Sequence, residues 1–344
     1  MVPTVVAARI HRPGEFRRRQ HRDSLANLAG SPSRLLGRRG SWLMAERFSV
    51  IIPNWNGKRF LAACLDALRD QTIGDIEIIL VDNASADGSQ DFVRAEYPEV
   101  RLIALEENRG FTGACNIGMD AATGAYIALL NNDTEVERNW AEQVANAFAA
   151  HPHAGIVASK MLLFDRRDHL HTAGDFFTTD GRAGNRGAWE CDCGQYDNGE
   201  YVFSACGGSA AYRRSMLSDI GALDDDFFFL LEDVDLAWRA QLAGYKVWYE
   251  PSAVVYHYLS ATGGGVTASY HDGRNGIWLI VKCMPAGLAR KYARQIIARQ
   301  LSLLWDSLKS WRGQEARARL RGMAAGLLSI GGALAKRKRI QASK

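Results

Sequence analysis

The chain has 344 residues, 47% of them hydrophobic and 23% charged, which is typical of a folded protein with one large or two small domains. It contains no run of about 18 apolar residues, so a membrane-spanning helix is not expected. The net charge of +4 is uneven, because residues 1–43 and 284–344 are basic and the segment between them carries −15. A nucleic-acid reader would instead carry positive charge on its folded body, so that class is excluded.

The basic ends leave two interpretations open. A catalytic body held near anionic lipid by its tail would have this charge distribution, and so would a protein with a merely solubilising tail. Residues 1–47 lack the apolar stretch of a secretory signal, and the six cysteines are scattered. Both features predict a cytoplasmic protein with reduced thiols, either free or peripheral on the inner face of the cell membrane. Cys191 and Cys193 have C-x-C spacing without a second pair, so zinc is not expected.

Residues 1–47 are rich in arginine and show no sustained apolar period, which predicts a disordered segment. From Phe48 onward, apolar segments alternate with segments of helical period. The predicted strands are Phe48–Pro53, Ile76–Val81, Val100–Leu105 and Ala125–Leu130. The predicted helices cover Phe60–Leu68, Asp87–Tyr97 and Phe111–Ala122. Strands that are apolar throughout and alternate with helices predict a Rossmann-like α/β fold, with a mostly parallel sheet flanked by helices.

The second half of the chain is more mixed. Gly207-Gly208-Ser209-Ala210 precedes a predicted helix, where the glycines would let a sugar or acceptor approach the backbone. Arg290–Leu304 is a basic amphipathic segment, which predicts a helix that either packs on the domain or lies on a membrane surface. We therefore expect one α/β domain over residues 48–283 and a basic helical extension over 284–344.

Polar residues follow each of the four predicted strands. They are Asn54 and Asn56; Asp82, Asn83 and Ser85; Asn108, Arg109 and Gly110; and Asn131, Asn132 and Asp133. One such ending could be turn chemistry alone. Four in succession predict a ligand site, because ligands of parallel sheets bind at the carboxyl ends of the strands.

The sequence has neither G-x-G-x-x-G after the first strand nor G-x-x-x-x-G-K-[ST] anywhere, so phosphates would not be held by a glycine loop. A nucleoside diphosphate would then need a divalent cation. Mg²⁺ and Mn²⁺ prefer carboxylate and phosphate oxygens, and Asp133 follows a buried strand.

Five short motifs resemble those of family 2 glycosyltransferases with the inverting GT-A fold, over about residues 48–283. In order they are Asn54-Trp-Asn-Gly57, Val81-Asp-Asn-Ala-Ser85, Asn108-Arg-Gly-Phe111, Leu129-Leu-Asn-Asn-Asp133 and Leu231-Glu-Asp-Val-Asp-Leu236. The pattern is similar to the rhamnosyltransferase-like branch, which builds bacterial cell-surface polysaccharides. Trp238, Arg239 and Arg274-Asn275 also match this branch, without implying a role.

The resemblance implies a set of donor-binding residues. These are Pro53, Asn54, Asn56, Asp82, Asn83, Asn108, Arg109, Asn116, Asn131 and Asn132. Within this set, Asp82 would hydrogen-bond the pyrimidine base.

The resemblance also implies a metal site. Asp133 would be the metal-binding member of the D-x-D motif, with Asn131 in place of the first Asp. Asn131 removes a charge from that motif. His257, after an apolar strand, would be a second ligand; a satisfied core histidine is the alternative interpretation.

Inverting transfer needs one carboxylate to take the proton of the acceptor hydroxyl. Asp233 is the candidate, because Glu232 and an apolar aromatic run lie beside it and would raise its pKa. An acidic first turn of a helix is the alternative explanation of this segment.

Together these features predict a metal-dependent transferase that uses Mn²⁺ or Mg²⁺ and a dTDP- or UDP-linked sugar, with rhamnose suggested by the branch. The expected acceptor is a glycan or a polyprenyl-diphosphate-linked glycan. Two alternatives stay open. A nucleotidyltransferase would need a phosphate-gripping loop after the first strand, and a non-catalytic nucleotide-sugar sensor or scaffold would explain Asn131.

Overall fold

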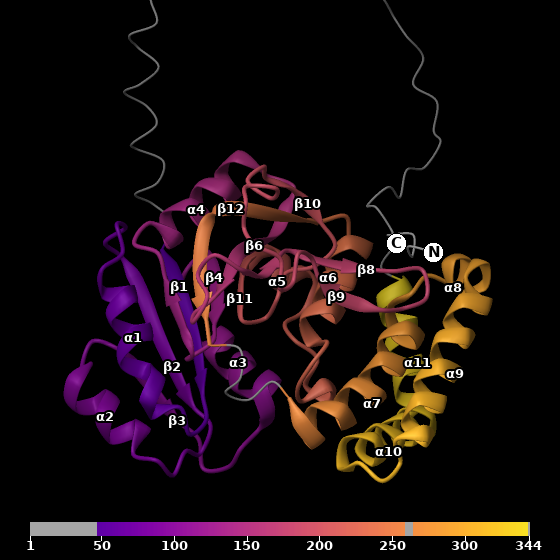
Figure 1. Cartoon of the computed structure of the whole chain (residues 1–344). Helices are drawn as coiled ribbons and strands as arrows, with labels where there is room; N and C mark the ends of the chain where they lie inside the picture. Colours follow the sequence, from indigo (N-terminus) through magenta and orange to yellow (C-terminus); the bar gives the residue numbers. More distant parts are fainter. Residues whose placement is uncertain (1–46, 259–263, 343–344) are drawn as a thin grey trace, which may run out of the picture.

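The computed structural model describes residues 47–258 and 264–342. The prediction of disorder over residues 1–47 therefore lies almost wholly outside the described residues. A mixed sheet forms the centre of the molecule, with helices on both of its faces (Figure 1). Its strand order is β10-β12-β6-β11-β4-β1-β2-β3, with β5 beside β12 and β7 beside β6. The predicted α/β fold with a helical C-terminal region is confirmed.

The first half of the chain contains every predicted strand and helix, with ends shifted by one or two residues. The elements are β1 (Phe48–Asn54), α1 (Lys58–Arg69), β2 (Ile76–Asp82), α2 (Ser89–Glu96), β3 (Arg101–Ala104), α3 (Gly110–Ala121) and β4 (Tyr126–Leu130). β1 pairs in parallel with both β2 and β4, and β2 with β3.

The side chains of β1 alternate between the two faces of the sheet, as expected for a strand buried on both sides. Val50 and Ile52 pack in the hydrophobic cluster that includes α1, whereas Ile51 packs in the cluster that includes α3. The helices on either side of β1 therefore cover opposite faces. This is the topological switch point at which open α/β sheets bind ligands. β1 pairs with β4 only as far as Ile51, so Pro53 and Asn54 extend beyond the last β1–β4 pair.

The second half completes the sheet with mostly antiparallel strands. The elements are β5 (Thr134–Val136), α4 (Trp140–Ala150), β6 (Ala154–Leu163), β7 (Leu170–Ala173), β8 (Asp175–Phe177), β9 (Ala183–Asn185), β10 (Glu200–Val202), β11 (Ser209–Arg213), α5 (Arg214–Ile220), the 3₁₀ turn η2 (Asp225–Phe227), α6 (Glu232–Leu242) and β12 (Lys246–His257).

The prediction of a helix directly after Gly207-Gly208-Ser209-Ala210 is wrong. Ser209–Arg213 is instead the strand β11, and helix α5 begins only at Arg214. β11 is antiparallel to both β4 and β6, so it is a central strand of the sheet. Its pairing on both edges outweighs the local helix preference of its alanines, which is the usual way that tertiary context overrides propensity.

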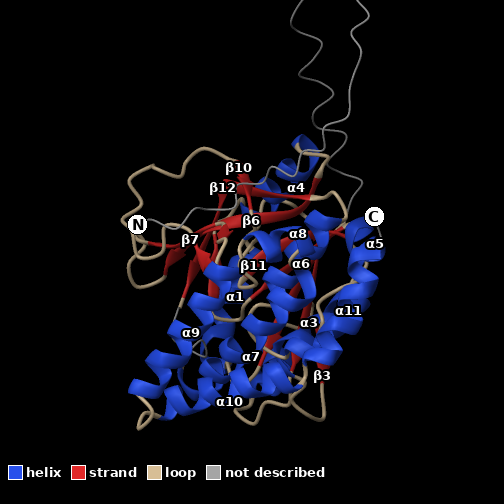
Figure 2. Ribbon diagram, turned by 90° about the vertical axis from the view of Figure 1, so that its right-hand side faces the viewer, coloured by secondary structure: helices blue, strands red, loops and turns tan. Residues whose placement is uncertain are grey.

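Five helices form the C-terminal region: α7 (Gly265–Cys283), α8 (Ala286–Lys291), α9 (Ala293–Lys309), α10 (Gln314–Leu328) and α11 (Ile330–Ala342). They lie together at one side of the sheet, drawn orange to yellow in Figure 1, and α7, α9 and α10 are seen at the lower part of Figure 2. Glycines let α10 cross α7 closely, because a Cβ on Gly322 would lie 2.0 Å from the carbonyl oxygen of Tyr270. The predicted helix Arg290–Leu304 is present as two helices, α8 and α9, with a break at Tyr292. None of the helices that the structure describes is both long and apolar enough to span a bilayer.

Candidate functional site

Asn54, Asp82 and Asn132 form one hydrogen-bonded group at the carboxyl edge of β1, β2 and β4. The Asn54 amide donates to Asp82 Oδ2 at 2.8 Å and its oxygen accepts from Asn132 Nδ2 at 2.6 Å. Asp82 Oδ1 also accepts from the backbone N–H of Ser85 and from Gln90 Nε2. Asp82 is fully buried. The structure thus joins three of the predicted donor-binding residues into a rigid floor.

Asn56 extends this floor through the loop after β2. Its backbone N–H donates to Ser85 Oγ at 2.8 Å, and its side-chain oxygen accepts from the N–H of Ala86 at 2.8 Å. Asn56 has φ 53°, a left-handed conformation that Asn tolerates better than most residues. The sequence therefore folds here as a turn whose amide groups face the loop after β2.

Asn83 joins the loops that follow β2 and β3. Its Nδ2 donates to Asn108 Oδ1 at 2.9 Å and to the carbonyl of Gly110 at 3.0 Å, and its Oδ1 accepts from the N–H of Arg109 at 2.8 Å. Gly110 has φ +73°, and the Phe228 ring lies where a side chain on Gly110 would point. The Asn108-Arg-Gly-Phe segment is therefore held in place on both sides.

Asn116 lies apart from these groups. Its amide donates to the carbonyl of Leu223 and to Asp225 Oδ1, and its oxygen accepts from the N–H of Leu223 at 3.0 Å. Both ends of the amide are thus engaged by the 223–225 loop. Asn116 and Arg109 line a shallow pocket of about 440 Å³ on the outside of α3. The predicted role of Asn116 in holding the nucleotide-sugar stays a prediction.

Asp133, His257 and Asn131 come together at the ends of β4 and β12. His257 Nε2 lies 3.1 Å from Asp133 Oδ1 and 3.4 Å from Asn131 Nδ2. Asp133 and His257 are both buried, 5% and 8% exposed. The antiparallel pairing of β5 with β12 places His257 opposite Thr134, the residue after Asp133. Sequence positions 124 residues apart are therefore brought into contact by the sheet itself.

His171 is a third histidine at this place, and sequence reasoning gave it no role. Its Nδ1 lies 3.1 Å from His257 Nδ1, on the ring edge opposite Asp133. Burial, and next to it the nearby His257, lower the pKa of His171 to about 3, so it is neutral at pH 7. His257 thus has His171 at its Nδ1 and Asp133 at its Nε2, and His171 has Asn185 Nδ2 at 3.3 Å from its own Nε2, so neighbours fix the orientation of both rings. Only the pairing of β7 with β6, itself next to β12, brings the two rings together.

The types of side chain at Asp133 and His257 suit a small divalent cation, but their number is too small to complete its coordination. One carboxylate and one imidazole whose second nitrogen is held by a neighbour are ligands that Mn²⁺ accepts. The residues that the structure describes contain no group of three or more His, Cys, Asp or Glu side chains placed to hold a metal. The protein would therefore supply two ligands, Asp133 and His257, and a cation would need the diphosphate oxygens or water for the rest.

Asp233 and Glu232 begin helix α6 on the other side of a two-glycine turn. The N–H of Gly207 donates to Asp233 Oδ2 at 2.8 Å. A Cβ on Gly207 would lie 3.5 Å from both carboxyl groups, whereas one on Gly208 would lie 3.4 Å from Asn131 Nδ2 and 3.5 Å from His257. Adjacent Cα atoms are about 3.8 Å apart. The candidate base and the candidate metal ligands therefore belong to one site, divided only by Gly207 and Gly208.

Burial raises the pKa values of the two carboxyl groups at the start of α6, Glu232 and Asp233. Burial, and then the charge of Asp233, raise the pKa of Glu232 well above its usual range. Glu232 is 5% exposed, and its Oε2 atom lacks a hydrogen-bond partner among the described residues. Burial also raises the pKa of Asp233, although the N–H groups of Gly207 and Val234 act against it. A buried Asp175, which the sequence did not single out, has its pKa raised by burial and by Asp233.

Asp235, the third acid of this segment, takes no part in the site. Its carboxylate pairs with Arg239 Nε at 2.9 Å and Lys282 Nζ at 2.6 Å, and it is fully buried. Burial alone would raise its pKa, but Arg239 and Lys282 lower it below the usual range. The acidic start of α6 is therefore divided: Glu232 and Asp233 face the glycine turn, and Asp235 joins α6 to α7.

Comparison with known proteins places the chain in a family. Residues 49–221, about half of the chain, match the family model of glycosyl transferase family 2. The pre-mycofactocin glycosyltransferase of Mycobacterium tuberculosis is 30% identical over 221 residues, which is 61% of this chain and 42% of the relative. The putative glycosyltransferase EpsH of Bacillus subtilis is 34% identical over 99 residues, 28% of each chain. This chain thus spans less than half the length of these relatives.

Two solved structures share the fold at low sequence identity. S. aureus TarS, residues 1–349, has a TM-score of 0.52 at 18% identity, over 86% of this chain and 90% of that one. GalNAc-T7 with UDP, GalNAc and Mn²⁺ has a TM-score of 0.55 at 15% identity, over 69% of this chain and 48% of that one. Since its central domain matches the family model from the first strand through α5, the chain belongs to glycosyl transferase family 2.

Proposed function

We propose that this protein is an inverting glycosyltransferase that moves a sugar from a dTDP- or UDP-linked donor to a glycan or polyprenyl-diphosphate-linked acceptor in cell-surface polysaccharide synthesis. The observation that carries the proposal is the two-sided site around Gly207 and Gly208, with Asp233 on one side and Asp133 and His257 on the other. Rhamnose is the proposed sugar, on the resemblance to the rhamnosyltransferase-like branch.

The donor would lie along the carboxyl edge of β1, β2 and β4. The buried Asn54 and Asp82 hold the partly exposed Asn132 there, so the edge that would face the nucleotide is already ordered. Asp133 and His257 would hold Mn²⁺ or Mg²⁺, which when bound neutralises charge on the leaving diphosphate. Asn131 leaves this half of the site with one carboxylate.

Asp233 would act as the general base. The N–H of Gly207 fixes one carboxylate oxygen at the glycine turn, and the N–H of Val234 donates to the other at 2.7 Å. As the acceptor oxygen bonds to the anomeric carbon, its proton passes to Asp233 and the bond from that carbon to the diphosphate oxygen breaks, with inversion. A raised pKa strengthens Asp233 as a proton acceptor, and a protonated Glu232 avoids a second negative charge beside it.

Turnover of a donor panel tests this proposal. Release of dTDP or UDP from nucleotide-sugars would be measured with Mn²⁺ or with EDTA, with membrane extract as acceptor and Asp233→Asn as the control. Metal-dependent release that Asp233→Asn abolishes supports the proposal and identifies the donor. Binding without release from any donor would favour the sensor or scaffold instead. If EDTA leaves the release unchanged, Asp133 and His257 do not bind a metal that the reaction needs.

We also propose that the protein contacts the cytoplasmic face of the membrane through α9. The inner side of this helix packs on the body through Ile296 and the buried Ser307. Its outer side carries five exposed apolar side chains at helical spacing: Ile297, Leu301, Leu304, Trp305 and Leu308. Figure 1 places α9 at the outer edge of the molecule.

Charge complementarity makes an anionic bilayer the proposed occupant of this face. Arg294 and Lys309 lie at its two ends, exposed, and Trp311 extends it beyond the helix. Apolar and tryptophan side chains bordered by cations are typical of helices that lie in the lipid interface. Flotation with phosphatidylglycerol vesicles should recover the wild type, and the Leu301→Ser/Trp305→Ser variant should stay unbound, while the exposed Leu328→Ser serves as the control. Equal flotation of all three proteins, or a dimer that the double substitution disrupts, would contradict the proposal.

A further inference from the structure

The segment 227–231, which precedes the candidate base Asp233, has positive φ angles at residues that do not favour them. Phe228, Leu230 and Leu231 have φ of 63°, 68° and 68°, and none of them is a glycine. Phe228 also has ψ −50° and the N–H of Phe229 donates to the carbonyl of Phe227 at 2.7 Å, which is a strained γ-turn. Leu231 is the N-cap of α6, so this backbone determines where Glu232 and Asp233 begin.

Asn275 of α7 holds this segment by its main chain. Its Nδ2 lies within hydrogen-bonding distance of three carbonyl oxygens, those of Phe227 at 3.1 Å, Phe229 at 2.9 Å and Leu230 at 2.8 Å. Asn275 is fully buried, and its contact with the carbonyl of Phe227 is buried as well. Its neighbour Arg274 donates to the carbonyl of Asp226 at 2.6 Å. Strained backbone of this kind persists only where surrounding groups determine it.

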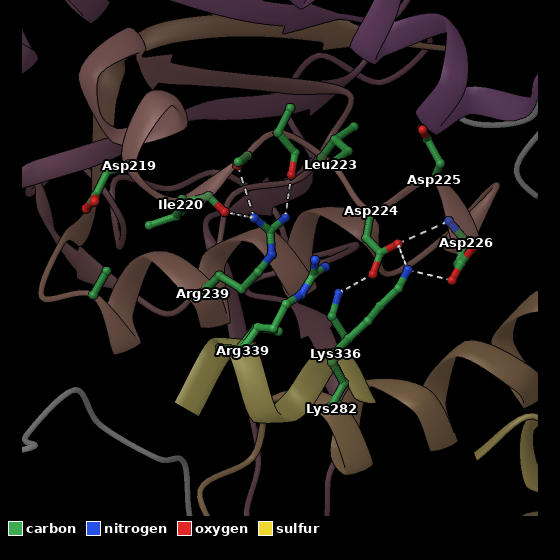
Figure 3. A pocket seen from close by; sticks show the side chains of 14 residues that line it. Asp219, Ile220, Leu223, Asp224, Asp225, Asp226, Arg239, Lys282, Lys336 and Arg339 are labelled. Atoms are coloured by element: carbon green, nitrogen blue, oxygen red, sulfur yellow. Dashed lines mark hydrogen bonds and ion pairs between the residues drawn. The ribbon is translucent and has the colours of Figure 1, made fainter. Parts of the chain in front are cut away.

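The last helix holds the start of the same segment by ion pairs. Lys336 of α11 lies 2.5 Å from both Asp224 Oδ1 and Asp226 Oδ2, and Lys282 of α7 lies 2.5 Å from Asp224 Oδ2 (Figure 3). These groups line an open pocket of about 640 Å³. The lysines in it are paired with these carboxylates, so the cluster serves as a clamp on the 224–231 segment rather than as an anion site.

We propose that Asn275 is a positioning residue for the transfer reaction, holding the strained 227–231 backbone so that Asp233 meets the acceptor hydroxyl. The expected effect on kcat rests on the proposed function, whereas the expected effect on the backbone does not. Asn275 touches neither Asp233 nor the donor floor, and it acts through the three carbonyls. Lys336 adds to the same clamp from the far end of the chain.

Asn275→Leu keeps a branched side chain of similar size and removes the amide N–H groups that donate to the three carbonyls. We expect its kcat to fall about 10²-fold, the effect of misplacing a reacting group by about 1 Å. The donor Kd should stay within about threefold of the wild type, because Asn54, Asp82 and Asn132 lie on other elements. Asn275→Gln, which keeps the amide donors, should recover a large part of kcat. A kcat of Asn275→Leu within threefold of the wild type would overturn the proposal.

A matched control separates positioning from loss of stability. Val144→Ala removes buried side-chain atoms on α4, which packs in the cluster on the other face of the sheet. If Val144→Ala lowers kcat as much as Asn275→Leu at the same fall in Tm, the effect is structural and the proposal is wrong.

Hydrogen exchange supplies a readout that does not need activity. Amide exchange over residues 224–235 should quicken in Asn275→Leu and stay at the wild-type rate in Val144→Ala. Unchanged exchange in Asn275→Leu would overturn the proposal even if no donor is ever found. Absence of turnover in the wild type would instead contradict only the proposed function.

Discussion

The two sides of the site are held in place in different ways. On the donor side, Asn54 and Asp82 end strands and Asn83 directly follows one, and most of their long-range partners are 25 to 31 residues away in the chain, although Asn132 is 78 residues from Asn54. On the base side, the segment before Asp233 is held by Asn275 and Lys336, which lie 45 to 112 residues away. Turn-forming Asn, Asp and Gly make the donor side, whereas Phe and Leu in left-handed conformations precede the base. The donor side is therefore fixed by turn residues at the ends of neighbouring strands, and the base side by α7 and α11 packing against a backbone that its own residues do not favour.

The largest effect should separate the two sides kinetically. Asp233→Asn removes the proton acceptor and keeps the shape, so we expect kcat to fall by about 10²–10⁴-fold. Donor affinity should be unchanged, since Asp233 is held by the turn at Gly207, whereas Asn54 and Asn132 lie at Gly57. Initial rates at saturating donor and calorimetric titration of the nucleotide measure the two quantities. Weakened nucleotide binding at unchanged kcat would show that Asp233 belongs to the donor side.

The next effect should appear in stability. Lys282 is buried between Asp224 and Asp235. Lys282→Met should lower the free energy of unfolding by about 2–3 kcal/mol, less than for a fully broken buried pair because each carboxylate keeps one cation. The partly exposed Lys336→Met should cost less than about 1 kcal/mol. Urea denaturation measures both, and equal losses would mean that Lys282 is not the main link between α6 and α7.

A donor-side change should be smaller and confined to binding. Asn54→Ala leaves Asp82 Oδ2 without its 2.8 Å donor and Asn132 Nδ2 without its acceptor. We expect roughly tenfold weaker nucleotide-sugar binding, about 1.4 kcal/mol, because Asn132 is no longer held at the donor edge. The kcat at saturating donor should stay near the wild-type value. A fall in kcat with unchanged Kd would contradict the division between the two sides.

The smallest effect is a pH dependence of stability. Because the pKa of Glu232 is raised in the folded protein, the folded state binds more protons than the unfolded state above about pH 4.3. Stability of the wild type should therefore fall as the pH rises through that window, and Glu232→Gln should lack this contribution. Denaturation at pH 5 and pH 8 should show the variant gaining relative to the wild type at the higher pH. The same difference in unfolding free energy between variant and wild type at both pH values would contradict a raised pKa of Glu232 in the folded protein.

Much of the donor side could be predicted because strand period and turn residues are local signals. The segments Phe48–Asn54 and Tyr126–Leu130 are apolar throughout, which identifies them as buried strands, and the Asn and Asp residues after them mark the ligand edge. β11 was missed because Ser209–Arg213 is short and rich in alanine, and only its two strand partners make it a strand.

The sequence by itself determined the parallel half of the sheet, the edge at which the polar residues gather, and the acidic start of α6. Each of these depends on residues near one another in the chain, whose spacing decides which face or end they share. Only the tertiary structure decided the rest. It brought His171 into contact with His257 and paired Asp235 with Lys282 instead of the site. It also left one face of α9 exposed, and it brought Asn275 into contact with the backbone that precedes Asp233. Those outcomes depend on which distant elements pack together, and periodicity carries no information about that choice.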